Sequence, residues 1–95
     1  MWYVYILRCV DGTLYTGITT DLAQRLQTHN AGTGAKYTRS RLPVEMVYSE
    51  SLPSHSEALK REYTVKQLTR AQKLHLIETA KAKKDLAFCP SQLYD

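Results

Sequence analysis

The stretch that decides the fold runs from residue 2 to residue 18, where WYVYILRC (2–9) is followed by VDGTLYTGI (10–18). The first part is rich in aromatic and β-branched residues, which favours a β-strand over Trp2–Cys9. Asp11-Gly12 is a strong signal for a hairpin turn, and Leu14–Ile18 has the composition of the returning strand. The sequence therefore predicts that the chain begins with a β-hairpin.

The register of this hairpin decides whether Tyr5 and Tyr15 share a face of the sheet. A two-residue loop at Asp11-Gly12 would put them on opposite faces, because cross-strand partners share a face. A three-residue loop with Gly12 in the left-handed conformation would instead pair Val10 with Leu14. The residues that would then share one face are Tyr5, Leu7, Cys9, Tyr15 and Gly17. A site that uses both tyrosines therefore predicts the bulged turn.

The middle of the chain predicts a helix, a loop and a third strand. Thr20 or Asp21 is a suitable cap for a helix that runs to about Asn30. The segment 31–41 contains two glycines and reads as an irregular loop. Residues 44–51 alternate as a strand does, which predicts that three of their side chains lie on one side: Val44, Met46 and Tyr48.

Two capping boxes, Ser54-x-x-Glu57 and Thr69-x-x-Gln72, predict two further helices. The apolar face of the first is expected to contain Ala58, Leu59, Tyr63 and Val65 or Lys66. The inward face of the second is expected to contain Leu74, Ile77 and Ala80. The order β-β-α-β-α-α predicts an α+β fold, a small three-stranded antiparallel sheet flanked by helices. We expect one domain over residues 1–84, with a loose tail over residues 85–95 that contains Pro90.

The composition favours a cytoplasmic protein with an anionic partner. Thirteen basic and nine acidic residues give a net charge of +4, which favours nucleic acid before a membrane surface. The two cysteines match no metal-ligand spacing; we expect Cys9 to be a buried strand residue and Cys89 an incidental thiol of the tail. The chain shows neither the pattern of a signal peptide nor an apolar stretch of membrane-spanning length.

Five polar residues become informative only in combination: Tyr5, Tyr15, Arg25, His29 and Glu62. Taken singly, a strand tyrosine usually packs in the core, and a charged residue on an amphipathic helix is usually solvated. Arg25 and His29 are four residues apart, so they lie on one face of the predicted helix. The basic residues Lys36, Arg39 and Arg41 could equally belong to a solvated loop.

The order of these residues resembles the GIY-YIG nuclease superfamily, and in particular its small stand-alone bacterial members, the YhbQ-like proteins. The residues that carry the resemblance are Tyr3-Val4-Tyr5, Tyr15-Thr16-Gly17, Arg25-x3-His29 and Glu62. The stretches 14–22, 34–38 and 62–69 are also similar to that subgroup. The resemblance extends from residue 1 to about residue 80 and implies the same three-stranded fold.

The resemblance also implies a chemistry, the hydrolysis of nucleic-acid phosphodiesters with one divalent metal ion, Mg²⁺ or Mn²⁺. Glu62 would hold the metal, because such ions prefer carboxylate oxygens. Arg25 would grip the phosphate oxygens with its planar fork. Either Tyr5 or Tyr15 would orient or deprotonate the attacking water. His29 would hydrogen-bond a tyrosine or a phosphate.

Further positions follow from the resemblance or depart from it. Gly17 would leave room for the substrate backbone. The chain has Tyr3 and Thr16 where the motif names have Gly and Ile. It has Ile18 where excision-repair relatives have lysine, and Leu74 where many active relatives have asparagine. Residues of the loop could then contact nucleic acid, with Tyr37 stacking on an unpaired base and phosphate contacts from Lys36, Arg39 and Arg41.

Three functions are compatible with these observations. The leading hypothesis is a metal-dependent endonuclease that acts on DNA rather than RNA, selects branched or single-stranded forms, and serves DNA repair or processing. The alternative is a non-catalytic module that binds nucleic acid through a nuclease fold. A third hypothesis is an interaction domain that recruits a repair protein, whose binding would survive high salt, whereas phosphate binding would not.

Overall fold

Three antiparallel strands form a sheet in the order β2-β1-β3, so the first strand of the chain lies at the centre. The computed structural model describes residues 1–88, with side chains described for residues 1–81. In chain order the elements are β1 (Trp2–Arg8), β2 (Leu14–Thr19), α1 (Leu22–Asn30), α2 (Lys36–Arg39), β3 (Glu45–Leu52), α3 (His55–Gln67) and α4 (Arg70–Phe88). The predicted α+β fold, a three-stranded antiparallel sheet flanked by helices, is confirmed.

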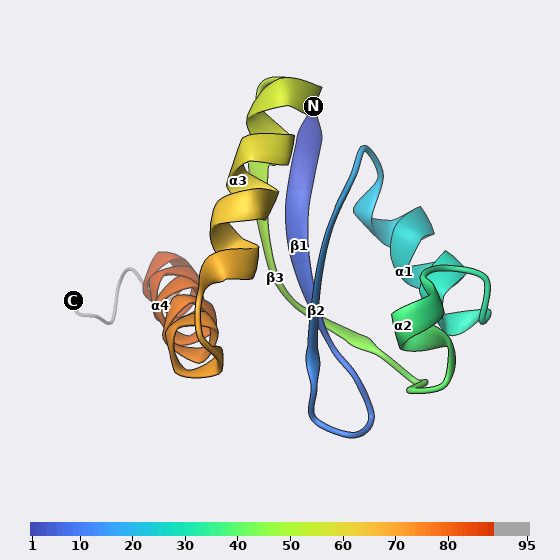
Figure 1. Cartoon of the computed structure of the whole chain (residues 1–95). Helices are drawn as coiled ribbons and strands as arrows, with labels where there is room; N and C mark the ends of the chain where they lie inside the picture. Colours follow the sequence, from blue (N-terminus) through green and yellow to red (C-terminus); the bar gives the residue numbers. More distant parts are fainter. Residues whose placement is uncertain (89–95) are drawn as a thin grey trace.

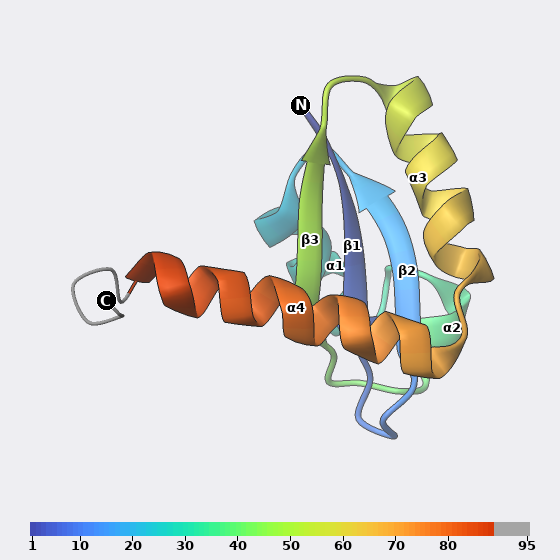
Figure 2. The ribbon, with the colours of Figure 1, turned by 90° about the vertical axis from the view of Figure 1, so that its left-hand side faces the viewer.

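The sheet separates two apolar clusters that lie on its opposite faces. Helices α1 and α2 cover one face, while α3 and α4 cover the other (Figure 1). Viewed from the second face, α4 crosses the strands and α3 lies beside β2 (Figure 2). The buried residues on the α1 face are Tyr5, Leu7, Cys9 and Val44, and those on the other face are Val4, Ile6 and Val65. Cys9 is buried, as predicted.

The first hairpin has the predicted three-residue loop with a left-handed glycine, but the loop comprises Val10–Gly12. The Cys9 amide donates to the Thr13 carbonyl at 2.8 Å, and Gly12 has φ 85°. The predicted pairing of Val10 with Leu14 was wrong, since Arg8 pairs with Leu14. In a three-residue hairpin loop, the last residue adopts the left-handed conformation. Gly12 is therefore the third residue of this loop. A two-residue shift preserves the faces, and Tyr5 and Tyr15 share one face as predicted.

Strand β3 contains an irregularity that the alternating pattern did not reveal. Its register against β1 shifts between Ile6 and Leu7, so that Val47 is an additional residue between the partners Tyr48 and Met46. Val44 and Met46 therefore pack on the α1 face, whereas Tyr48 packs on the other face. The prediction that all three share a side was wrong, because a bulge inverts the alternation beyond it.

The predicted helix starts are confirmed by their caps. The Asp21 carboxylate accepts from the Gln24 amide at 3.0 Å, and the Ser54 hydroxyl accepts from the Glu57 amide. At Thr69 both bonds of a capping box form, because the Gln72 side chain also accepts from the Thr69 amide at 2.9 Å. The segment 31–41 is not entirely irregular, since it contains the short helix α2.

Two features of the last helices differ from the expectations: the exposure of two residues of α3 and the point at which α4 ends. On α3, Ala58 and Val65 are buried as expected, but Leu59 and Tyr63 are exposed by 46% and 69%. Only a narrow side of α3 meets the sheet, so residues on its flank remain in solvent. Helix α4 continues to Phe88, past the expected boundary at residue 84. Cys89 and Pro90 lie outside the described residues, and the domain boundary stays a prediction.

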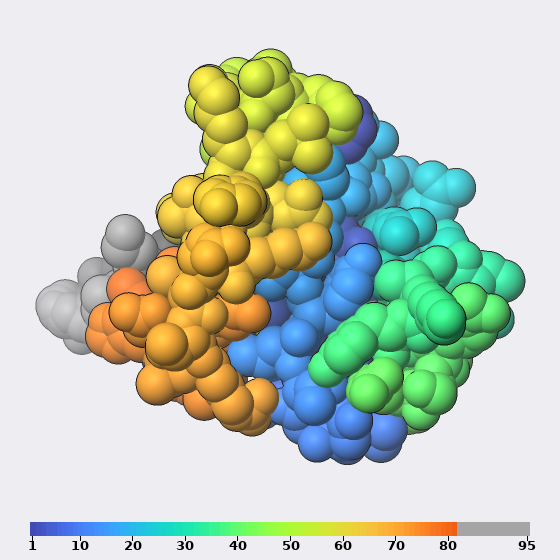
Figure 3. Space-filling model, in the orientation of Figure 1, coloured from blue at the N-terminus to red at the C-terminus, as the bar shows by residue number. Residues whose placement is uncertain are grey.

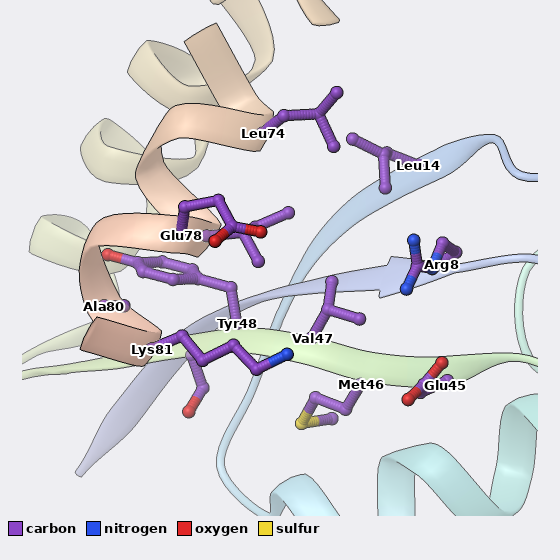
Figure 4. Close-up of a pocket in the computed structure, with 12 residues that line it drawn as sticks. Arg8, Leu14, Glu45, Met46, Val47, Tyr48, Leu74, Glu78, Ala80 and Lys81 are labelled. Atoms are coloured by element: carbon purple, nitrogen blue, oxygen red, sulfur yellow. The ribbon is translucent and has the colours of Figure 1, made fainter. Parts of the chain in front are cut away.

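A cavity of about 940 Å³ lies between α4 and the sheet (Figure 4). Its apolar lining includes Leu14, Val47, Leu74 and Ile77, and charged residues stand at its edges. Leu74 therefore faces this cavity on the side of the sheet opposite to Tyr5. None of the helices in the described part of the chain is long and apolar enough to cross a membrane.

Candidate active site

The phenol of Tyr5 lies directly over Gly17 of the neighbouring strand. The two residues are cross-strand partners, and a Cβ placed on Gly17 would lie 2.6 Å from the Tyr5 hydroxyl oxygen. The absence of a side chain at Gly17 thus lets the phenol extend over β2, the edge strand of the sheet. Gly17 makes room for Tyr5, and its expected role of leaving space for a substrate stays a prediction.

The Tyr5 hydroxyl joins the sheet to helix α1 through two hydrogen bonds. It lies 3.0 Å from Nε2 of His29, and it accepts from Nε of Arg25 at 3.2 Å. Tyr5 and His29 are almost fully buried, with 1% and 0% of their surfaces exposed. Arg25 is half-buried. Arg25 uses its Nε for Tyr5, and no bond of its two terminal amino groups is found among the described residues, so they can bind an anion.

The other ring nitrogen of His29 is bonded to a residue of helix α2. Nδ1 lies 2.8 Å from the hydroxyl oxygen of Thr38, and that hydroxyl donates to the Ala35 carbonyl at 3.1 Å. Thr38 is completely buried. Gly34 covers the ring, since a Cβ there would lie 2.5 Å from Nδ1. The imidazole is therefore held on both of its nitrogens and packed against a backbone without a side chain.

Burial sets the resting protonation of Tyr5 and His29. Burial raises the pKa of Tyr5, and the positive charge and hydrogen bond of Arg25 oppose that rise. The charges of Tyr15 and Glu62 also raise the pKa of Tyr5, so both groups lie within electrostatic reach of its phenol. Burial and the nearby Arg25 lower the pKa of His29. Near neutral pH the site therefore holds a neutral phenol and a neutral imidazole.

Tyr15 lies beside this hydrogen-bonded group and connects it to the surface. Its ring meets the His29 ring edge-on, with centroids 5.4 Å apart, and stacks on Tyr37 at 6.0 Å. The Arg41 guanidinium lies 4.1 Å from the Tyr37 centroid and is held by Asp11 at 3.1 Å. Tyr37 is 40% exposed, so part of its ring still faces solvent.

Glu62 belongs to α3, which covers the other face of the sheet (Figure 1). The residue before it, Arg61, ties α3 to β3 through a bond to the Glu50 carboxylate. Tyr48 donates to the same carboxylate at 2.6 Å. The Glu62 side chain is 19% exposed and forms an ion pair with Lys66 at 3.3 Å. No direct contact between Glu62 and Tyr5 is found in the described residues, and the charge of Glu62 acts on the phenol at a distance.

The resemblance implies a divalent ion, and Glu62 is the carboxylate expected to hold it. No cluster of three or more His, Cys, Asp or Glu residues occurs within the described part of the chain. Ions such as Mg²⁺ commonly bind through one or two carboxylates, together with waters and substrate phosphates. Glu62 therefore fits an ion that is also held by the phosphate of a nucleic acid.

A hollow separates α3, which carries Glu62, from α1, which carries Arg25 and His29 (Figure 3). Strand atoms lie in this hollow between α3 and the α1–α2 segment in the space-filling view (Figure 3). Tyr5 contacts Arg25 and His29, Tyr15 packs against His29, and Glu62 acts on Tyr5 only through its charge. Lys36 and Arg39 are exposed on α2, whereas Arg41 is bound to Asp11 and to the Tyr37 carbonyl.

Sequence reasoning missed Thr38 and Gly34 as parts of the site. In the sequence Thr38 is only part of the stretch 34–38 that resembles the YhbQ-like proteins. Its contact with His29 depends on how α2 folds onto α1. Asn30 was also missed: its side-chain amide bonds both the amide and the carbonyl of Val44, which ties α1 to the start of β3.

Comparisons with known proteins agree with this fold. Residues 1–75 match the model of the GIY-YIG catalytic domain. A UPF0213 protein of Halobacterium salinarum is 59% identical over 73 residues, which cover 77% of this chain and 95% of that protein. A UPF0213 protein of Staphylococcus haemolyticus is 57% identical over 76 residues, covering 80% of this chain and 93% of the relative.

A solved structure leads to the same assignment. The solution structure of a UPF0213 protein from Bacillus halodurans is 49% identical and superimposes with a TM-score of 0.54, covering 83% of this chain and 85% of that one. The fold, the order of the motif residues and these relatives agree. The chain therefore belongs to the GIY-YIG family, among its YhbQ-like proteins.

Proposed function

We propose that this protein is a metal-dependent endonuclease that hydrolyses DNA phosphodiester bonds. The observation that supports the proposal is the bonding of one phenol, Tyr5, to both a neutral imidazole and a guanidinium. An imidazole can take the proton of the phenol, and a guanidinium stabilises the resulting negative charge. The imidazole would give the phenol proton a route away from the oxygen, and the guanidinium would remain to hold the charge.

We assign the role of general base to Tyr5 rather than Tyr15. The Tyr5 proton moves to Nε2 of His29, and the Tyr5 oxygen then takes a proton from the attacking water. The water oxygen forms a bond to phosphorus as the bond to the departing ester oxygen breaks, and that oxygen leaves with a proton from solvent. Tyr15 lacks a comparable pair of partners in the described residues, and its contacts with His29 and Tyr37 are packing contacts.

Arg25 and Glu62 complete the proposed site. The terminal amino groups of Arg25 would hold the phosphate, while its Nε keeps the Tyr5 oxygen in place. Glu62 would bind the divalent ion, Mg²⁺ or Mn²⁺. The ion, when bound, neutralises the phosphate and stabilises the departing oxygen. Its binding would require the Glu62 carboxylate to separate from Lys66.

The proposed DNA surface extends from the site along α2. Lys36 and Arg39 are exposed there and would contact phosphates, while Tyr37 offers the exposed part of its ring to a base. Arg41 would act mainly through Tyr37, because Asp11 holds its guanidinium. So few side chains can read little base sequence, which favours selection by DNA shape. We propose a role in DNA repair or processing in the cytoplasm.

The experiment is a cleavage assay on labelled branched DNA and on plasmid DNA with Mg²⁺ or Mn²⁺. The wild type should cut at least one substrate, and Glu62→Gln should not. Glu57→Gln is the matched control, because it removes an exposed carboxylate of the same helix. Absence of cleavage by the wild type, or equal cleavage by the Glu62 variant, would refute the proposal.

A non-catalytic DNA-binding module is the second candidate, and the ion pair between Glu62 and Lys66 favours it. A lysine at this position can neutralise the carboxylate without any metal. In that case binding of branched DNA would be unaffected by metal removal and by Glu62→Gln, and it would weaken steeply with salt. Gel-shift titrations with EDTA and with Mg²⁺ separate the two candidates.

A further inference from the structure

Thr38 decides which nitrogen of His29 carries the proton. A neutral imidazole has one N–H group and one lone pair, and the partner of each nitrogen selects between them. The Thr38 hydroxyl donates its only hydrogen to the Ala35 carbonyl at 3.1 Å. Towards His29 Nδ1, at 2.8 Å, its oxygen therefore acts as an acceptor. This arrangement places the imidazole proton on Nδ1.

The surroundings of Tyr5 favour the same tautomer, and the bond to Thr38 adds to that preference. The Tyr5 oxygen already accepts from Arg25 Nε, and its own hydrogen needs an acceptor because the residue is buried. Within the described residues, the remaining hydrogen-bond partner of that oxygen is His29 Nε2 at 3.0 Å. A proton on Nε2 would leave the phenol hydrogen without a partner. With the proton on Nδ1, every polar hydrogen of the group is bonded.

We propose that Thr38 is a positioning residue that holds His29 in the Nδ1–H tautomer, so that the Nε2 lone pair points at the Tyr5 phenol. This inference rests on the proposed function only for its consequence in catalysis. The hydrogen bonds then run in one direction: Tyr5 O–H to His29 Nε2, His29 Nδ1–H to Thr38 Oγ1, and Thr38 O–H to the Ala35 carbonyl.

The direction of this chain has a consequence for the reaction. When the Tyr5 proton moves to Nε2, both nitrogens of His29 carry protons, and Nδ1–H keeps its bond to Thr38. The positive charge formed on the ring is therefore stabilised without any rearrangement. In the opposite tautomer Nε2 already carries a hydrogen, so it cannot accept the Tyr5 proton.

The test is nitrogen NMR of histidine side chains in the intact protein, above neutral pH, with ¹⁵N-labelled histidine. Two-bond correlations distinguish a protonated from an unprotonated ring nitrogen. The His29 signals are separated from those of the other histidines, His55 and His75, by their loss in His29→Gln. The variants are Thr38→Ser, which keeps the hydroxyl, and Thr38→Val, which keeps the shape and removes it. Amide spectra establish that each variant is folded, and Thr38→Ala replaces the valine variant if that one does not fold.

We expect Nδ1 to be protonated and Nε2 unprotonated in the wild type and in Thr38→Ser, and a mixture of tautomers in Thr38→Val. We also expect Thr38→Val to lower kcat by about tenfold or more, with Thr38→Ser restoring most of it. A protonated Nε2 in the wild type, or an unchanged tautomer in Thr38→Val, would overturn the inference. If the wild type has the expected tautomer and cuts no DNA, the proposed function fails while the tautomer assignment stands.

Discussion

The hydroxyl oxygen of Tyr5 lies 3.0 Å from Nε2 of His29, across 24 positions of the sequence and between the central strand and the first helix. This bond requires three separate features of the chain. The hairpin must place Tyr5 on the α1 face, Gly17 must leave space beneath the phenol, and α1 must turn His29 inward. The bond is therefore a sensitive indicator of whether the site is assembled.

Replacing Gly17 with alanine should disable the site. The new methyl group would lie 2.6 Å from the Tyr5 oxygen and would push the phenol away from His29 and Arg25. Since a displacement of about 1 Å can cost about 10²-fold in rate, we expect a loss of that size in kcat/KM. The overpacking should also cost about 1–3 kcal/mol of the free energy of unfolding. Cleavage assays and urea titrations measure the two effects.

Ile18→Val is the control for this substitution, because Ile18 lies on the same strand and packs on the opposite face. It should cost a little stability and leave cleavage intact. A Gly17→Ala protein that cuts DNA at the wild-type rate would show that the Tyr5 phenol need not stay over Gly17.

Replacing Arg25 with lysine should lower the rate although the charge is kept. Lysine lacks the fork that bonds the Tyr5 oxygen with Nε and leaves two amino groups for a phosphate. Loss of one such donor commonly costs about 10²-fold in kcat, and we expect a decrease of that order. Arg70→Lys, on the exposed start of α4, is the matched control and should cut normally. Equal rates for Arg25→Lys and the wild type would remove Arg25 from the site.

The pH dependence of stability should reveal the buried His29. Burial and Arg25 lower its pKa in the folded state below the ordinary value of about 6.5. Above about pH 6.5, the folded and unfolded chains both hold a neutral His29, so this residue contributes no pH dependence. Below it, the unfolded chain binds a proton that the folded chain does not, and stability falls until the folded pKa is reached. Urea titrations from about pH 8 to pH 5 should show this decline.

His29→Gln isolates that contribution from those of other groups. The difference in unfolding free energy between the wild type and His29→Gln should shrink as the pH falls below about 6.5. A difference independent of pH would contradict the lowered pKa.

The pH profile of cleavage should reflect the same lowered pKa. Because catalysis needs a neutral His29, the decrease of kcat/KM on the acid side should occur below about pH 6.5.

Thr16→Val should stabilise the protein. The Thr16 hydroxyl oxygen is buried and has no hydrogen-bond partner within the described residues. Valine has the same shape and removes the unsatisfied group, so we expect a gain of up to about 1 kcal/mol in urea titrations. Thr16→Ser keeps the hydroxyl, loses the methyl group and should be less stable than the wild type. A loss of stability in Thr16→Val would mean that the hydroxyl has a favourable interaction in solution.

Local signals predicted much of this fold. Asp11-Gly12 and the two capping boxes act through bonds between residues close in sequence, so the hairpin and helix starts could be predicted from the chain alone. The exact loop residues depended on knowing that the left-handed Gly12 ends the turn. The β3 bulge at Val47 and the exposure of Tyr63 depend on packing between distant segments. No local sequence pattern predicts either of them.

The candidate site was predictable only in part for a related reason. Tyr5, Tyr15, Arg25, His29 and Glu62 were selected by their order and by a family resemblance. The contacts among them are set by tertiary structure. Thr38 had no sequence signal of its own, because a threonine in a polar loop is ordinary. Its place beside Nδ1 of His29 exists only when α2 folds onto α1.

The most direct test of the central claim is the rate at which labelled branched DNA is cut in single-turnover assays with Mg²⁺ or Mn²⁺ by the wild type and by Tyr5→Phe. The variant keeps the ring and loses the oxygen that bonds His29 and Arg25. The proposed site predicts that the wild type cuts DNA and that Tyr5→Phe, folded by its amide spectrum, is slower by about 10²-fold or more. Cleavage by Tyr5→Phe at the wild-type rate, or no cleavage by the wild type, would contradict it.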